Sequence, residues 1–364
     1  MKFLETALAC WQFNIKNKAS KHRFPLLKLP RVVLLECIEN LDVLEIIVFS
    51  LLSKRAKSIT KLIRWNPLKI RLLNDVDGTV NICLGLSTHP GLRWIIEYTN
   101  DDKSSKYPYL QTYLFGPKVN HFLGQWYDRN AIENSKQMTE HICEVFRSPI
   151  SFIQIAKESL IEWIIEFQPT IPHVWICNSV ILSADTLDRI SKSLKVTEHF
   201  GFKSIGADEK IPFTEPIPYR SITIDNSHLV ALSSILNGTN SNILLYNSKL
   251  TPMDINSILK EWQKGTKLRN LEFFEIQTFT QLDTVECTRE IFKDLNYTVS
   301  FGNDGRPMTV IIDDDYHITL PEVEMVLNLT RSDGTILSIF GHYGVSEDEK
   351  TKIFLDLQVW RKQA

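Results

Sequence analysis

The sequence lacks the features that mark several common classes of protein. Its six cysteines are scattered along 364 residues, with no two closer than 27 positions, so the paired spacing of a zinc or redox motif does not occur. Glycine (14) and proline (15) are too few for a low-complexity or collagen-like chain. No run of 18 apolar residues is present, and we therefore expect no membrane-spanning helix.

Neither sign of charge is in excess. Lysine and arginine number 41 against 43 aspartates and glutamates, which gives a formal net charge of −2. This balance argues against a protein that coats nucleic acid or an acidic membrane, and we expect neither as a partner. The scattered cysteines, and a first segment with Glu5 inside a very short apolar stretch, favour a cytoplasmic and/or nuclear protein over a secreted one. No pattern of metal ligands is evident, and we expect neither a metal nor a cofactor.

Three short helices are predicted near the N-terminus. Pro30 is well placed as the first residue of a helix, where its missing N–H is not needed. The apolar residues after it recur with a helical period at Val33, Leu34, Cys37, Ile38 and Leu41. Asp42, with Glu45 three residues on, predicts a capping box at the start of a second helix, whose C-terminal end we place at the basic residues 53–57. A third amphipathic turn covers residues 59–63.

These helices carry more apolar residues than a bundle of about 40 residues can hide. The surplus must face either the rest of the chain, as a helical cap on the main domain, or another protein. The sequence of the segment resembles an F-box. The resemblance rests on residues 24–30 (Phe-Pro-Leu-Leu-Lys-Leu-Pro), on Leu41-Asp42 and Phe49-Ser50, and on residues 53–57 (Ser-Lys-Arg-Ala-Lys), an ending similar to the nematode version of the motif. Ala56 stands where many F-boxes have a tryptophan.

The F-box resemblance implies a docking function. It implies that the segment binds a Skp-type adaptor and, through that adaptor, a cullin ubiquitin ligase. Carried over position by position, the implied adaptor contacts are Leu29, Pro30, Val33, Leu34, Ile38, Leu41, Ile46 and Ile47. Burial of each such aliphatic side chain contributes roughly 1.5–3 kcal/mol, so five or six of them would form the core of an interface.

The remainder of the chain predicts a mixed α/β region. Residues 68–73, 79–84 and 92–98 are strand candidates, and residues 130–168 look helical. From about residue 174, strands and helices alternate, and the strand starts at 221, 242 and 271 suit a leucine-rich-repeat-like stack. One helix is expected to be capped by Ser227, and the next to begin at Thr251-Pro252 and to end at Gly265. A hairpin around residues 331–334 and a closing helix complete the prediction.

The C-terminal pattern resembles a second known domain. Residues 255–262 (Ile-Asn-Ser-Ile-Leu-Lys-Glu-Trp), the turn with Gly265 and residues 271–274 (Leu-Glu-Phe-Phe) look like the type 2 F-box-associated domain of nematode F-box proteins, and residues 327–334 are similar to its tail. We expect an N-terminal arm over 1–21, an F-box over 22–65 and a substrate-recognition region over 66–364, with the type 2 motif at about 205–278. The expected fold class is mixed α/β, with a small three-helix F-box followed by a strand–helix, leucine-rich-repeat-like domain and some β-hairpins.

One motif favours an enzyme instead. Residues 75–80 (Asp-Val-Asp-Gly-Thr-Val) resemble the nucleophile loop of haloacid-dehalogenase-type phosphohydrolases, in which Asp75 would attack phosphorus and Asp77 would act as acid and base beside Mg²⁺. Residues 313–315 (Asp-Asp-Asp) could form a second metal-binding loop. The alternative is a hairpin turn, since Asp-Gly between alternating apolar strands is a strong hairpin signal. Residues 79–84 alternate as a strand does, which favours the hairpin.

The sequence therefore predicts a protein without catalytic activity. It would be the substrate-receptor subunit of an SCF-type cullin ubiquitin ligase, with a Skp-type adaptor on its F-box and an unidentified target protein on its C-terminal domain. The residues of the target-binding face are not predicted, because one sequence does not show which surface positions vary.

Overall fold

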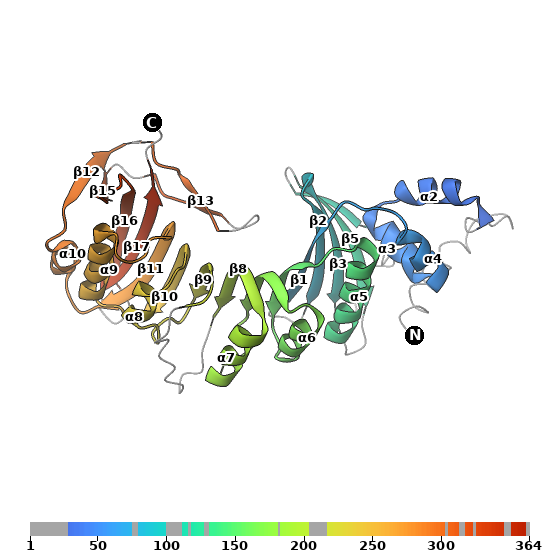
Figure 1. The fold of residues 1–364 in the computed structure, drawn as a ribbon, viewed down its shortest axis with the longest axis horizontal. Coiled ribbons are helices and arrows are strands. Elements are labelled where there is room, and N and C mark those ends of the chain that lie inside the picture. Colours follow the sequence, from blue (N-terminus) through green and yellow to red (C-terminus); the bar gives the residue numbers. More distant parts are fainter. Residues whose placement is uncertain are drawn as a thin grey trace. The chain divides into compact units, whose positions relative to one another are not determined.

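The protein divides into two compact units, residues Met1–Ile153 and Gln154–Ala364, in a computed structural model (Figure 1). The structure describes residues 28–74, 79–99, 111–115, 118–126, 131–180, 183–203, 217–302, 305–312, 317–322, 325–345 and 351–361. These residues form nine helices and a large set of strands, which confirms the predicted mixed α/β class. None of the helices in the described ranges is long and apolar enough to cross a membrane. The expected limits of the N-terminal arm (1–21), the F-box (22–65) and the substrate-recognition region (66–364) stay a prediction.

The first unit opens with three short helices, α2 (Arg31–Glu39), α3 (Val43–Leu51) and α4 (Lys54–Thr60). Helix α2 follows Pro30, and Asp42 forms the predicted capping box with Glu45 at the start of α3. The prediction for the basic residues was wrong. Ser53 is extended and its hydroxyl accepts a hydrogen bond from the N–H of Ala56, so residues 54–57 begin α4 instead of ending α3.

A sheet with one helix packed against it completes the first unit. Its strands are β1 (Leu68–Asn74), β2 (Val80–Leu86), β3 (His89–Thr99), β4 (Gln111–Phe115), β5 (Lys118–Trp126) and β6 (Ile150–Ile155), in the order β6-β1-β2-β3-β5-β4. Strands β1 and β2 are antiparallel and alternate buried with partly exposed side chains, as the hairpin prediction requires. Helix α5 (Ala131–Phe146) packs against β1, β2 and β3.

The second unit begins with tandem strand–helix units. Parallel strands β7 (Thr170–Ile176), β8 (Lys195–Phe202), β9 (Ser221–Ile224), β10 (Asn242–Ser248) and β11 (Phe273–Thr280) lie side by side in that order. Helix α6 (Ser159–Phe167) precedes β7, and α7 (Ala184–Ser193), α8 (Leu232–Leu236) and α9 (Pro252–Lys264) connect later strands. Helix α9 has the predicted capping box of Thr251 with Asp254, and Gly265 ends it with a positive φ of 75°.

Three details of this region differ from the prediction. Strand β6 interrupts residues 130–168, which were expected to be helical, and β8 was not predicted. Helix α8 starts after Ala231 instead of Ser227, whose hydroxyl donates to the carbonyl of Tyr246 on β10. A short apolar segment such as β6 fits a strand or a buried helix equally well by period alone.

Antiparallel strands close the second unit. Helix α10 (Thr284–Phe292) leads to β12 (Tyr297–Phe301), β15 (Met325–Thr330), β16 (Ile336–Val345) and β17 (Thr351–Trp360), and β17 pairs antiparallel with β11. The hairpin at residues 331–334 is confirmed, since β15 and β16 pair across it. The predicted closing helix was wrong. Partly exposed and buried side chains alternate over residues 352–357, a period of two that a strand satisfies and a helix does not.

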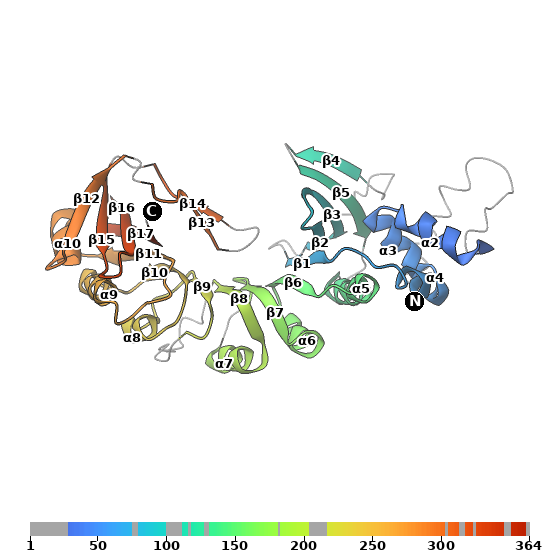
Figure 2. The same ribbon diagram turned by 45° about the horizontal axis from the view of Figure 1, so that its top comes forward.

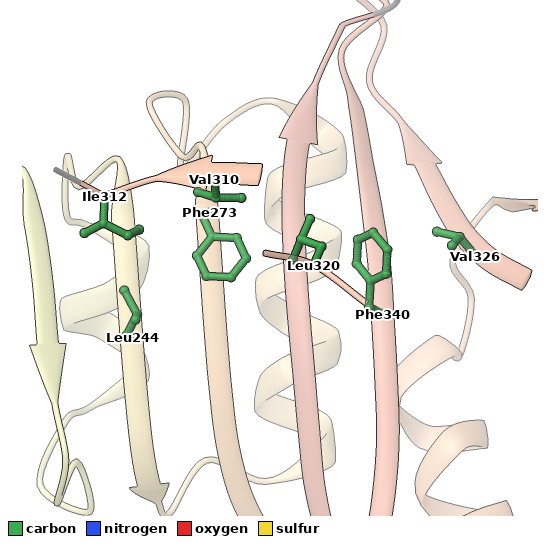
Figure 3. Close-up of a cluster of buried hydrophobic side chains, with 7 residues drawn as sticks. All are labelled: Leu244, Phe273, Val310, Ile312, Leu320, Val326 and Phe340. Atoms are coloured by element: carbon green, nitrogen blue, oxygen red, sulfur yellow. The ribbon is translucent and has the colours of Figure 1, made fainter. Parts of the chain in front are cut away.

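A short two-stranded arm covers part of the second unit's sheet. Strands β13 (Thr309–Ile311) and β14 (His317–Thr319) form this arm, and Figure 2 shows it on the opposite face of the sheet from α8 and α9. The buried side chains between the arm and the sheet form one cluster (Figure 3), which consists of Leu244, Phe273, Val310, Ile312, Leu320, Val326 and Phe340.

Candidate functional site

The three N-terminal helices share a small core. Its buried members are Leu34, Ile38, Phe49, Ala56 and Ile63, and the partly buried side chains packed around them include Leu29, Leu35, Leu41, Leu52, Ile59 and Trp65. The indole N–H of Trp65 donates to the carbonyl of Thr60 at 3.1 Å, which fixes the ring after the end of α4. Much of the apolar surface of the three helices is therefore buried in contacts among them.

Burial divides the eight predicted adaptor contacts into three groups. Pro30 and Val33 are exposed, the latter with 43% of its surface accessible. Leu29 and Leu41 are partly buried at the margin of the core. The remaining four are buried inside the first unit, and they are Leu34, Ile38, Ile46 and Ile47. Without a rearrangement of the helices, only the first two groups can touch another protein, and the contact role of all eight stays a prediction.

The structure adds exposed apolar residues that sequence reasoning missed. Val32 is 69% exposed beside Val33 on α2, and Leu62, just after α4, is exposed as well. Cys37, one helical turn after Val33, also faces solvent. Val32 lies outside the apolar stripe that contains Leu34 and Ile38. The sequence feature that indicates its exposure is the run of four apolar residues over 32–35, which is too wide for one side of a helix. Exposed apolar residues grouped on one helix mark an interaction surface more often than single ones do.

Charged side chains of both signs flank this surface. Lys28 and Arg31 are exposed at the start of α2, and Glu36 and Glu39 are exposed toward its end. Exposed charges of this kind mainly affect the rate and specificity of association. The exposed face of α2, defined by its N-cap Pro30 and by Val32, Val33 and Cys37, thus combines apolar side chains with charged ones among and around them.

The residues of the enzymatic alternative cannot be placed. Asp75, Asp77 and residues 313–315 lie outside the described residues. The strands on either side of the first motif pair antiparallel, with Asn74 opposite Val80, as in a hairpin. Nothing in the described part of the chain supports a phosphohydrolase.

Comparison with known proteins identifies two segments of the chain. Residues 26–66 match the F-box domain, and residues 216–276 match the F-box associated family. The first segment contains α2, α3 and α4, and the second contains β9, α8, β10 and α9. Searches among curated proteins and among solved structures found no match. Neither domain match bears on the nematode form of the motifs, which stays a prediction. The chain therefore contains an F-box domain followed by an F-box-associated domain, as the resemblance predicted.

Proposed function

We propose that the protein is a non-catalytic substrate-receptor subunit of an SCF-type cullin ubiquitin ligase. The F-box binds a Skp-type adaptor, the adaptor joins the protein to the cullin, and the region after the F-box binds a target protein. The order of the two matched domains supports this proposal, since an F-box followed by an F-box-associated domain is typical of substrate receptors. We propose a location in the cytoplasm and/or the nucleus, where such ligases act.

The observation that carries the docking half of the proposal is the exposed face of α2. Val32 is 69% and Val33 43% exposed, although Leu34 and Ile38, on the same helix, are buried. A helix with one apolar side in its own core and further apolar residues in water can gain free energy by binding a partner there. Burial of one such valine contributes roughly 1.5–3 kcal/mol.

The proposed mechanism is proximity. A receptor that holds a target and a ligase at the same time raises the effective concentration of the target's lysines near the charged ubiquitin. No side chain of the receptor then needs to take part in bond making or bond breaking. The chemistry belongs to the other subunits of the ligase.

A matched pair of substitutions tests the docking surface. Val33→Asp places a carboxylate at the centre of the proposed contact, and we expect it to weaken binding to a purified Skp-type adaptor by about tenfold or more, measured by pull-down and titration. Val285→Asp is the control, because Val285 on α10 is 73% exposed but lies in the second unit. Equal binding by both variants, or no binding by the wild type, would contradict the proposal.

A further inference from the structure

Helix α5 of the first unit contacts both the sheet and the F-box. It packs against β1, β2 and β3, and it also contacts α3. Three polar contacts join the F-box helices to α5 and β3, and we call them the linking contacts. They are Asp42 with Trp94, Ser50 with His141, and Lys57 and Lys61 with Glu144.

The first linking contact holds the start of α3. The indole N–H of Trp94 on β3 donates to Oδ2 of Asp42 at 2.7 Å, while Oδ1 of the same carboxylate accepts the N–H of Leu44 at 2.9 Å. Trp94 is buried and its ring stacks with His121 on β5. The carboxylate that caps α3 is therefore also held by the sheet, so the N-terminus of this helix has a fixed position on β3.

The second linking contact holds the end of α3. The hydroxyl of Ser50 lies 2.7 Å from Nε2 of His141 on α5 and also donates to the carbonyl of Ile47 at 2.7 Å. A serine has one hydroxyl proton, so when that proton goes to the carbonyl of Ile47, Nε2 of His141 is the donor to Ser50. Burial, reinforced by the charge of Lys57 and opposed by that of Glu144, lowers the pKa of His141 to about 4. The imidazole is therefore neutral near pH 7. A neutral imidazole with its proton on Nε2 can donate to Ser50 without placing a charge inside the protein.

The third linking contact joins α4 to α5. Glu144 accepts from Lys57 through Oε2 and from Lys61 through Oε1, the latter at 2.9 Å. The hydrogen bonds from Lys57 and Lys61 lower the pKa of Glu144 to about 2. Arg147, just after α5, donates to the carbonyl of Lys61 at 2.9 Å. One exposed ion pair contributes little, but both oxygens of one carboxylate are used here beside a backbone contact.

We propose that the F-box is not a separately moving module but forms one cooperative unit with the first sheet, in which Trp94, His141 and Glu144 are positioning residues for the exposed face of α2. The linking contacts attach the N-terminal end of α3 to β3, and the C-terminal end of α3 and one side of α4 to α5. Ile46 and Ile47 are buried on the same helix, which places α3 inside the unit. Only the part about the face of α2 rests on the proposed function, since the cooperative unit is a property of the chain alone.

Hydrogen exchange of the full-length protein in rising denaturant tests the cooperative unit. We expect α3 and α4 to open with the same free energy and denaturant dependence as β1–β3, as residues of one unfolding unit do. Exchange of residues 43–60 in an earlier step that leaves β1–β3 protected would overturn the proposal.

Two substitutions test the linking contacts. Trp94→Phe removes the donor to Asp42 but keeps an aromatic ring, and we expect exchange in α3 and the sheet to speed up together by about two- to tenfold. Glu144→Gln removes both ion pairs and should have a smaller effect in the same direction. Glu198→Gln, which breaks the exposed pair with Arg220 in the second unit, is the control and should leave residues 43–60 unchanged. Exchange that is equally slow in all four proteins would contradict the role of the linking contacts.

A distance measurement separates positioning from stability. Spin labels on Cys37 of α2 and on Thr88→Cys, in the exposed turn before β3, report the placement of the F-box on the sheet once the other reactive cysteines are replaced by alanine. We expect a narrow distance distribution that widens when Trp94→Phe and Glu144→Gln are combined. The adaptor affinity is measured separately on the unlabelled proteins with native Cys37, and it should be unchanged within about twofold. An unchanged distribution would overturn the positioning role. Failure of the wild-type protein to bind the adaptor would contradict the proposed function. It would not affect the hydrogen-exchange and distance measurements, which are made without the adaptor.

Discussion

Two side chains of α2, five residues apart, have opposite roles in the folded chain. Ile38 is completely buried in the F-box core with Leu34 and Phe49, whereas Val33 is 43% exposed. We expect Ile38→Ala to lower the free energy of unfolding by about 2–5 kcal/mol, because it leaves a cavity in a packed core. Val33→Ala should change it by about 0.5 kcal/mol or less.

Thermal and urea denaturation of the two variants check this contrast. Similar losses of unfolding free energy in the two variants would mean that Ile38 and Val33 do not differ in their contribution to the core. The contrast also shows that Ile38→Asp would report on folding and not on docking, since it buries a charge inside the F-box.

The motif located the F-box, but it could not separate the residues of its core from the exposed ones. Val32 to Leu35 are four apolar residues in succession, so a 3.6-residue period selects no single side of the helix. Which side faces inward depends on α3, α4 and the sheet, whose positions are set by contacts between residues such as Ser50 and His141, 91 positions apart. Such long-range contacts leave no local pattern in the sequence.

At the scale of the element, β11 and β17 place two acidic residues opposite each other. Glu275 lies directly opposite Asp356 across the antiparallel pair, and neither forms an ion pair within the described residues. Burial first, and the charge of Asp356 second, raise the pKa of Glu275 to about 7, although a hydrogen bond with Tyr246 on β10 opposes the shift. Burial raises the pKa of Asp356 to about 6.

These shifts predict that the second unit loses stability as the pH rises. A carboxyl group with a raised pKa binds its proton more strongly in the folded state, so its contribution is most favourable below the pKa of the unfolded chain and is lost as the pH rises through about 6 to 7. We expect Glu275→Gln to raise the free energy of unfolding at pH 8 by roughly 1–3 kcal/mol and to flatten its dependence on pH.

Denaturation of the full chain across about pH 5 to 8 measures this effect. Glu272→Gln is the matched control, because Glu272 is exposed three residues away and should give the wild-type profile. A wild-type stability that rises over this range, or a Glu275→Gln variant no more stable than the wild type at the upper end, would contradict the prediction.

The elements that sequence reasoning found have strong local signals, and those it missed do not. Helix α9 combines a capping box, a proline at its start and a glycine at its end, and it was predicted with its bounds. Strand β17 has no cap or turn signals. Apolar and polar residues alternate over 355–359, but consecutive apolar residues at 353–355 and 359–360 obscure that period. The start of α4 was misplaced because the same serine, Ser53, can end one helix or cap the next.

At the scale of the whole molecule, the F-box belongs to a larger unit than its motif. The domain match ends at residue 66 and β1 begins at Leu68, so no linker separates the F-box from the first sheet. The compact unit that contains both extends to Ile153. The sequence could suggest a helical cap or a docking module. In the structure, the same helices contact α5 and β3 and leave Val32 and Val33 of α2 exposed.

Cys37 lies on the exposed face of α2, where we propose that a Skp-type adaptor binds, and its reactivity reports directly on that binding. Cys37 faces solvent one turn from Val33, whereas Cys83 lies on β2 of the sheet. The measurement is the rate of maleimide labelling at each cysteine, by mass spectrometry, with and without purified adaptor. We predict that the adaptor slows labelling of Cys37 by about tenfold or more and leaves Cys83 unchanged. Binding of the adaptor with Cys37 labelled at its original rate, or no binding at all, would contradict the account.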